Sequence, residues 1–351
     1  MWLDTIDSQP MQKDIKSTVI STRIRIARNI EGYNFPSKLS RMKAKEIITK
    51  VDRAAAAMSS KRFKLYHMEE LSEGVIQSLC DEHLISKHLL QNRECSAALI
   101  DENTQQNISI MINEEDHLRQ QYISSGLALF KGYKELNKID NALAKTLCFA
   151  FDEALGYLTA CPTNIGTGLR ASVMLFLPGL TKQNRMAEIM HTVQVKGHTV
   201  RGVFGEGSSF EGNMYQVSNE VTLGESEESI LNEVHNTILT IVNAETEARK
   251  ILLAREQLEL KDACRRAYGI LLYSVKIGYE EFLQLISLIK LGIAFSFFSE
   301  FDFESFTTLN RLIAQVRPAS INLAFDREMS EEEQDIYRAE RCKQELLEKK
   351  G

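Results

Sequence analysis

The chain has 351 residues, 44% of them hydrophobic and 26% charged, as in a globular protein with a large buried core. Its formal net charge of −6 argues against nucleic acid as a direct partner, and none of its six cysteines forms a C-x-x-C pair that would indicate a zinc site. The N-terminus lacks the apolar core of a signal peptide, and residues 283–298 are too short for a membrane span, which predicts a cytoplasmic protein without a membrane partner.

The first 250 residues predict a mixture of strands and helices. Residues 19–27 alternate in polarity, with isoleucines on one face and Arg23 and Arg25 on the other, as a half-buried strand does. A polar segment separates the strands expected at 96–100 and 108–113, which is typical of a hairpin. The other elements expected here are a helix at 42–58, a helix at 141–155 with Asp140 as its N-cap, a strand at 173–177 closed by Pro178, and a strand at 215–223.

Long helical patterns follow Gly224. Ser226 precedes Glu227 and Glu228, so a capped helix with an acidic first turn is expected to start there. Further helices are expected at 258–273, 279–291, 303–316 and 330–349. Since nine of the 18 glycines fall between residues 156 and 212 and few follow, we place a domain boundary near residue 250, inside or after a long helix.

Five arginines are candidate phosphate ligands. In a strand, Arg23 and Arg25 point the same way about 7 Å apart, a spacing that fits two oxygens of a polyphosphate. Taken alone, this pair fits a solvated strand face better. Arg119, Arg170 and Arg201 each lie beside a glycine-rich or acid-rich turn, and arginine presents a planar fork of donors that suits phosphate. Together the five favour an anion-binding site.

Two glutamates are candidate ligands of a basic acceptor. Glu115 lies at the end of an expected strand, and Glu206 lies in the glycine-rich segment GVFGEGSSFEG. A carboxylate accepts both N–H groups of a guanidinium, and two of them would fix its plane and orient one nitrogen. One of the two would also accept the departing proton. The alternative for each is a surface ion pair with a neighbouring Lys or Arg.

The segment CPTNIGTG predicts a turn that begins at Cys161. A reactive thiolate there would need positive surroundings, which Arg170 could supply, whereas a buried structural cysteine is the alternative. GEGSSFEG only weakly matches a protein-kinase glycine loop, because H-R-D, D-F-G and G-x-x-x-x-G-K-[ST] are absent. The absence of H-E-x-x-H and G-x-S-x-G likewise argues against zincins and serine hydrolases. The role of His83 stays open, and His117 is expected near the site because it lies within NEEDHLR.

The segments STRIRIARN, NEEDHLR, CPTNIGTGLRASV and RGVFGE, in this order, resemble the phosphagen (guanidino) kinase family over residues 18–250. The chain is most similar to the bacterial members that phosphorylate arginine in proteins, because no all-helical domain precedes these segments and a helical one follows. The resemblance implies an α+β fold, with an antiparallel sheet flanked by helices. It also implies three parts: an N-terminal segment at 1–17, an ATP:guanidino phosphotransferase domain at 18–250, and a helical domain for dimerisation and phosphoarginine binding at 251–351.

The resemblance assigns roles to the matching residues. ATP and the transferring phosphoryl group would contact Ser21, Thr22, Arg23, Ile24, Arg25, His83, Arg119, Arg170, Ala171, Ser172, Val173, Met174, Arg201, Gly202, Val203, Phe204, Gly205 and Glu206. The catalytic residues would be Glu115, Glu206, Arg119, Arg170, Arg201 and Cys161. Glu115 and Glu206 would clamp the guanidinium, with Glu115 as the base. Mg²⁺ would be held mainly by ATP oxygens, without a protein metal site.

A second motif of the bacterial members differs here. Their R-D-x-x-R-A motif binds phosphoarginine allosterically, and the matching segment is QDIYRA. Asp335 and Arg338 are kept, one helical turn apart, but Gln334 replaces the first arginine and cannot pair with a dianion as a cation does. Allosteric self-activation is therefore expected to be weaker or absent, and a charged surface helix is the alternative.

The expected function is ATP-dependent phosphorylation of arginine side chains in proteins, in protein quality control or the stress response. The expected partners are proteins with exposed arginines, among them a heat-shock transcriptional repressor, together with an activator protein, a Clp-type protease and a second copy of the chain. Two alternatives remain. The first is a kinase of free arginine or another small guanidino compound, and the second is a phosphoarginine-binding adaptor with little catalysis.

Overall fold

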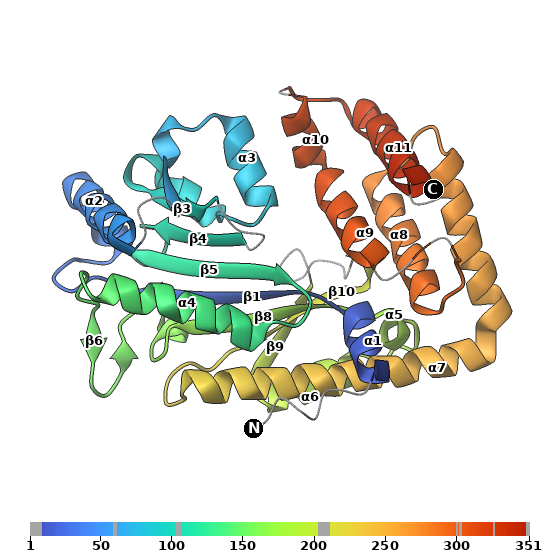
Figure 1. Cartoon of the computed structure of the whole chain (residues 1–351), viewed down its shortest axis with the longest axis horizontal. Helices are drawn as coiled ribbons and strands as arrows, with labels where there is room; N and C mark the ends of the chain where they lie inside the picture. The colour runs from blue at the N-terminus through green and yellow to red at the C-terminus, as the bar shows by residue number, and fades with distance from the viewer. Residues whose placement is uncertain are drawn as a thin grey trace.

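The computed structural model describes residues 9–58, 62–102, 107–202, 211–299, 301, 304–325 and 327–348. An eight-stranded antiparallel sheet lies at its centre, in the order β2-β3-β4-β5-β1-β8-β10-β9 (Figure 1). The strands of this sheet are β1 (Val19–Arg28), β2 (Phe63–His67), β3 (Ala97–Asp101), β4 (Asn107–Ile112), β5 (Leu118–Ser125), β8 (Leu169–Phe176), β9 (His198–Gly202) and β10 (Met214–Asn219). A separate hairpin joins β6 (Phe151–Asp152) to β7 (Gly156–Tyr157).

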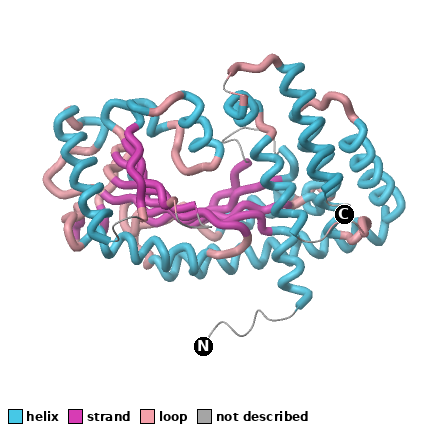
Figure 2. Tube along the Cα trace, turned by 45° about the horizontal axis from the view of Figure 1, so that its top comes forward, coloured by secondary structure: helices cyan, strands magenta, loops and turns pink. Residues whose placement is uncertain are grey.

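Helices cover one face of the sheet and gather beyond one end of it (Figure 2). The helices before residue 227 are α1 (Gln9–Thr18), α2 (Arg41–Met58), α3 (Glu73–Asp81), α4 (Leu129–Ala144), α5 (Pro178–Lys182) and α6 (Met186–Val195). The later helices are α7 (Glu227–Tyr273), α8 (Tyr279–Ala294), α9 (Glu304–Gln315), α10 (Pro318–Ala324) and α11 (Glu331–Glu348). Short 3-10 turns occur at η1 (Pro36–Lys38), η2 (Met68–Glu70), η3 (His88–Cys95), η4 (Pro162–Asn164) and η5 (Glu211–Asn213).

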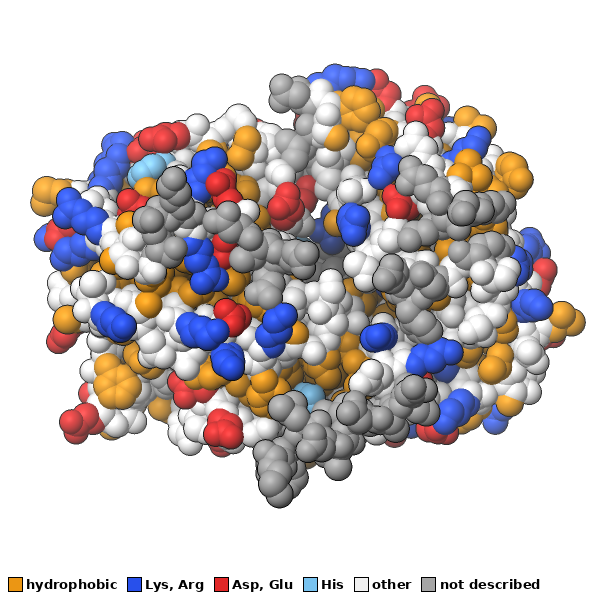
Figure 3. Space-filling model, viewed as in Figure 1, with side chains coloured by type: hydrophobic (Ala, Val, Ile, Leu, Met, Phe, Trp, Pro, Cys, Tyr) orange, Lys and Arg blue, Asp and Glu red, His pale blue; other side chains and the backbone are white. Residues whose placement is uncertain are grey.

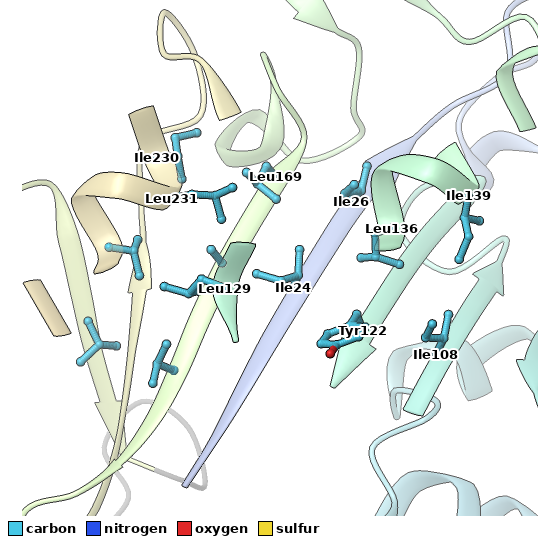
Figure 4. Close-up of a cluster of buried hydrophobic side chains, with 14 of the residues drawn as sticks. Ile24, Ile26, Ile108, Tyr122, Leu129, Leu136, Ile139, Leu169, Ile230 and Leu231 are labelled. Atoms are coloured by element: carbon cyan, nitrogen blue, oxygen red, sulfur yellow. The ribbon is translucent and has the colours of Figure 1, made fainter. Parts of the chain in front are cut away.

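Apolar and polar side chains alternate along β1, so the two faces of the sheet differ in character at this strand. Ile24 and Ile26 are buried against α4, whose Leu136 and Ile139 face the same cluster (Figure 4). The first part of α7 adds further apolar side chains to this core. Because successive side chains of a strand point to opposite faces, the arginines of β1 lie on the other, polar face. One face of the sheet therefore forms the main core. The other face is covered by α3 and its neighbours at β3 and β4, where Ala98, Ile100 and Met111 join a smaller apolar cluster, and carries the arginines at β1.

A second apolar core joins the C-terminal helices. It contains side chains from the second part of α7 and from α8, α9 and α11, and Phe176 of β8 reaches into it. Along α7, Ala248 belongs to the first core and Leu252 to the second. The predicted boundary near residue 250 therefore falls inside α7, and the division into domains stays a prediction.

Most of the predicted elements are present, and the predicted fold class is confirmed. The strand at 19–27 is β1, the helix at 42–58 is α2, and β3 and β4 pair antiparallel as the predicted hairpin strands. Ser226 caps α7, since its hydroxyl accepts a hydrogen bond from the amide of Ser229 over 3.1 Å. The helices α8, α9 and α11 lie within a few residues of their predicted bounds. The predicted helix at 258–273 is instead the second part of α7, which follows a kink at Glu256, and α10 was not predicted.

Two predicted elements were wrong. The helix at 141–155 is instead α4, which ends at Ala144, and the β6–β7 hairpin follows it. Asp140 is no cap, because it lies inside α4 and forms a buried ion pair with Arg28 over 2.8 Å. The strand at 215–223 ends at Asn219, whose side-chain amide bonds the backbone of β8 in place of further pairing.

Candidate active site

Strand register collects arginines on the polar face of the sheet. Arg25 of β1 lies opposite Arg170 of β8, and Ala27 lies opposite Arg119 of β5. Directly opposed residues of antiparallel strands point to the same face, and so does Arg23, two residues before Arg25. Four arginines from three neighbouring strands therefore share one surface.

Arg201 joins this surface from a more distant strand. It lies opposite Gln216 of β10, which lies opposite Met174 of β8, which in turn lies opposite Ser21 of β1. Each step keeps the side chains on the same face, so Arg201 points to the same side as Arg23 and Arg25. The chain order of these strands gives no hint of this proximity.

The sheet arginines are crowded, and some of their donors are unused. Among the described residues, the buried Nε atoms of Arg25 and Arg170 have no hydrogen-bond partner. Burial, and next the charge of Arg119, lower the pKa of Arg23 to about 9, and the same two causes lower that of Arg25 well below its ordinary value. Positive charge is thus disfavoured here, and a bound polyanion would relieve both the repulsion and the missing hydrogen bonds.

A cavity of about 250 Å³ opens onto these arginines. Its lining includes Arg25, Arg119, Arg170, Arg201, Glu115 and Cys161. Glu115 is exposed, and the Cys161 sulfur lies 3.0 Å from the Thr163 hydroxyl oxygen. Five of the six predicted catalytic residues therefore meet in one cavity. The sixth, Glu206, lies outside the described residues, as do Val203, Phe204 and Gly205, so the pairing of Glu206 with Glu115 stays a prediction.

The turn between β4 and β5 presents three acidic residues in three different ways. It begins at Asn113, which takes the left-handed conformation (φ 58°) that asparagine tolerates. Glu114 turns inward to pair with Arg119 and accepts a hydrogen bond from Ser86 over 2.5 Å. Its burial favours a higher pKa, but Arg119 and these hydrogen bonds hold it at about 2. Glu115 and Asp116 both line the cavity, and Glu115 is the exposed one of the three acids.

Asp116 ties this turn to the segment that carries Cys161. Its carboxylate accepts hydrogen bonds from the side chain of Asn29 over 2.6 Å and from the amide of Ala160 over 2.7 Å. Burial raises its pKa to about 6 despite these bonds. Sequence reasoning missed Asp116 and Glu114, and the only available signal was the run of three acids after a strand.

Glycine allows the CPTNIGTG segment to approach β1. Gly168 has φ +64°, and a Cβ there would lie 2.6 Å from the carbonyl oxygen of Ala27. The same close approach lets the Gly168 carbonyl accept a hydrogen bond from the amide of Ala27 over 3.0 Å. The glycine therefore brings the end of this segment against the strand that carries Arg25.

His117 does not face the cavity as its position predicted. Its ring is fully buried, where Nδ1 accepts from the amide of Ile30 and Nε2 lies 2.9 Å from the carbonyl oxygen of Asn34. These two bonds assign the Nε2–H tautomer. His117 is thus a structural residue that positions the chain after β1.

The predicted nucleotide contacts divide between the two faces of the sheet. The side chains of Ser21 and Met174 line a second cavity of about 850 Å³, and His83 lies at the same cavity. Ser172 is buried on the polar face, with its hydroxyl 3.3 Å from the Arg23 carbonyl oxygen, and Gly202 ends β9. The predicted contacts that turn into the core instead are Thr22, Ile24, Ala171 and Val173.

The predicted phosphoarginine contacts lie on α11. Arg338 is only 1% exposed and donates to the carbonyl oxygens of Ile277 and Val316 and to Asp335. Gln334 donates to the carbonyl oxygen of Met329 over 3.0 Å. In this structure Arg338 therefore connects α11 with the ends of two neighbouring elements.

The described part of the chain lacks two further classes of feature. None of its helices combines the length and apolar character that a membrane crossing needs. Its His, Cys, Asp and Glu side chains also form no group of three or more that could hold a metal ion.

Comparison with known proteins identifies two matching families. Residues 46–248 match the catalytic domain of the ATP:guanido phosphotransferases, and residues 257–351 match the protein-arginine kinase McsB C-terminal domain. The protein-arginine kinase of Clostridium kluyveri is 40% identical over 330 residues, 93% of this chain and 94% of that relative. That of Caldanaerobacter subterraneus subsp. tengcongensis is 39% identical over 93% of this chain and 96% of the relative.

Solved structures show the same fold. Lombricine kinase, 25% identical, superposes with a TM-score of 0.59 over 66% of this chain and 67% of its own. The duplicated taurocyamine kinase of Schistosoma mansoni, with bound transition state analog components, is 27% identical and has a TM-score of 0.59 over 72% of this chain and 37% of its own.

Proposed function

The chain belongs to the protein-arginine kinases of the ATP:guanido phosphotransferase family, and we propose that it transfers the γ-phosphoryl group of ATP to arginine side chains of proteins. The observation that carries this proposal is the small cavity on the polar face of the sheet. There Arg25, Arg119, Arg170 and Arg201 meet Glu115, so phosphate ligands and an acceptor for a guanidinium lie side by side.

The arginines would stabilise the phosphoryl group in flight. In phosphoryl transfer, negative charge spreads over the equatorial oxygens, and catalysis depends on positioning and electrostatic stabilisation. Arg25 and Arg170 are held on paired strands at the cavity, and their buried Nε atoms have no hydrogen-bond partner among the described residues. Their mutual repulsion would fall as the polyanion enters.

Glu115 would hold and deprotonate the acceptor. Its exposed carboxylate can accept N–H groups of a substrate guanidinium at the rim of the cavity. As the attacking nitrogen bonds to the γ-phosphorus, the bond from phosphorus to the bridging oxygen of ADP breaks, and Glu115 takes the proton from nitrogen. We propose Glu206 as the second carboxylate, and Cys161, which lines the cavity with Arg170, as a further contact of the guanidinium.

ATP would lie along β1. We propose that its nucleoside end occupies the larger cavity near Ser21, His83 and Met174, and that its phosphates extend past Arg23 towards Arg25. Residues 201–206 remain proposed nucleotide contacts. Mg²⁺ would be carried by the phosphate oxygens and would neutralise part of their charge.

We also propose the division into a catalytic domain at 18–250 and a helical domain at 251–351, which the change of core between Ala248 and Leu252 supports. Asp335 and Arg338 remain the proposed phosphoarginine contacts. Because Arg338 already bonds two backbone carbonyls, such binding would have to use its remaining N–H groups or open these bonds.

The proposed role is in a cytoplasmic stress response. The proposed partners remain a second copy of the chain, an activator protein, a Clp-type protease and a heat-shock repressor.

The test is mass spectrometry under conditions that preserve acid-labile P–N bonds. The protein is incubated with ATP and Mg²⁺ and offered either a mixture of folded proteins or free arginine. We expect phosphoarginine on the proteins. Phosphorylation of free arginine alone would establish the small-molecule alternative, and tight binding of phosphoarginine peptides without any transfer would establish the adaptor.

A further inference from the structure

The larger cavity has walls from two distant parts of the sequence. One wall carries Ser21, His83 and Met174, and the other carries Arg317, Tyr337 and Arg341. The space-filling view shows the surface hollowed between the part that carries α3 and the C-terminal helices (Figure 3). Ser320 of α10 and Asp81 of α3 bridge the two walls, since the serine hydroxyl donates to the carboxylate over 2.6 Å.

Arg317 is a cation with an unused donor in this cavity. Its side chain is half-buried, and its buried Nε has no hydrogen-bond partner among the described residues. It also lies near His83 on the opposite wall: enclosure of the imidazole, and next the charges of Arg317 and Arg23, lower the pKa of His83 to about 4. Arg317 and Arg23 therefore both bring positive charge close to His83.

The backbone at Arg317 is held by α11. Arg338 donates to the carbonyl oxygen of Val316 over 3.1 Å and to that of Ile277 over 2.7 Å. Pro318 follows directly and restricts the backbone of Arg317. The side chain is therefore directed from a fixed junction between α9 and α10.

We propose that Arg317 is a nucleotide-positioning residue, whose guanidinium binds the ribose and α-phosphate of ATP, so that the C-terminal helices complete the ATP site. This inference rests on the proposed function. The sheet arginines of the small cavity are placed for the outer phosphates, whereas Arg317 faces the Ser21 end of β1. A guanidinium fork can bond a phosphate oxygen and a hydroxyl together.

The experiment compares Arg317→Gln with Arg266→Gln in the full chain. Arg266 lies exposed on α7, so its replacement makes the same charge change away from the cavity. The readouts are KM and kcat for ATP, the Kd values of ATP and of inorganic pyrophosphate, and Tm. For Arg317→Gln we expect KM and Kd for ATP to rise ~10-fold, the effect of losing one charged hydrogen bond. We expect kcat, Tm and the Kd of pyrophosphate to match those of Arg266→Gln, and Arg317→Lys to recover part of the affinity.

An unchanged Kd of ATP in Arg317→Gln would overturn the inference. So would an equal loss of affinity for ATP and pyrophosphate together with a lower Tm, because that result assigns Arg317 to folding. Failure of the proposed function looks different: the unmodified protein would then form no phosphoarginine, while ATP binding would still report on Arg317.

Discussion

Arginines serve two different purposes in two regions of this protein. In the core, Arg28 bonds Asp140 and the carbonyl oxygen of Thr167, and Arg249 bonds Glu245 and the carbonyl oxygen of Phe176. On the polar face of the sheet, Arg25 is half-buried, and its buried Nε has no partner among the described residues. The core arginines join elements of the fold, whereas the arginines of the sheet face have donors available for a ligand.

This difference separates structural charge from functional charge. A buried cation is stable when it is paired and hydrogen-bonded, and costly when it is not. Arg28 is fully engaged within the folded chain, whereas Arg25 faces Arg23, Arg119 and Arg170. Arginines that have N–H donors without partners and that lie close to other arginines indicate a binding site more specifically than positive charge alone does.

The largest effect should follow from Arg25→Ala. We expect the rate of phosphoarginine formation to fall by ~10³–10⁵, as for other arginines that stabilise a transferring phosphoryl group. Tm should not fall, because the change removes repulsion and no ion pair. Initial rates and calorimetry measure the two effects, with the exposed Arg41→Ala as control. A normal rate would place Arg25 outside the site.

Glu115→Gln should be the next most damaging. Glutamine keeps the shape of the side chain but cannot take the proton, so turnover should fall by ~10²–10⁴. Glu153→Gln, in the exposed loop of the β6–β7 hairpin, makes the same change away from the cavity and should leave turnover normal. Both rates come from the phosphoarginine assay. Equal rates for the two variants would remove Glu115 from the mechanism.

Arg28→Ala should act on stability. It leaves Asp140 buried without its cation, so the free energy of unfolding should fall by about 3–5 kcal/mol. Replacing both residues by apolar ones, as Arg28→Met with Asp140→Leu, should restore much of this loss. Urea denaturation measures all three, with exposed Lys43→Ala expected to behave as the unmodified protein. A loss no larger in Arg28→Ala than in Lys43→Ala would show that Arg28 does not stabilise the fold.

Asp116 should make the smallest contribution, and it depends on pH. Its pKa is about 6 in the fold against an ordinary value of 3.8, so the folded state holds the proton more tightly. The contribution of Asp116 to stability should therefore be greatest below about pH 4 and fall by roughly 3 kcal/mol as pH rises through 6. Asp116→Asn keeps an acceptor oxygen without titrating. The difference in unfolding free energy between the two proteins should change over this window, and a constant difference would refute the assignment.

Local patterns predicted what depends on neighbours in sequence. The alternation of β1 put Arg23 and Arg25 on one face, and the Ser226 cap marked the start of α7. Asp140 was misread because its partner, Arg28, lies 112 residues away. His117 was misread in the same way, since its ring is bound by the backbone at Ile30 and Asn34.

Sequence by itself determined the strand and helix periods and the residue types that suit phosphoryl transfer, because these follow from short-range spacing and side-chain chemistry. The fold class was implied by the resemblance of four segments to the phosphagen kinases. Only the tertiary structure decided that Arg201 shares a face with Arg25, that Glu114 turns inward while Glu115 turns outward, and that Arg317 faces His83 across a cavity. Those facts depend on strand register and on packing between elements far apart in the chain, which no local pattern records.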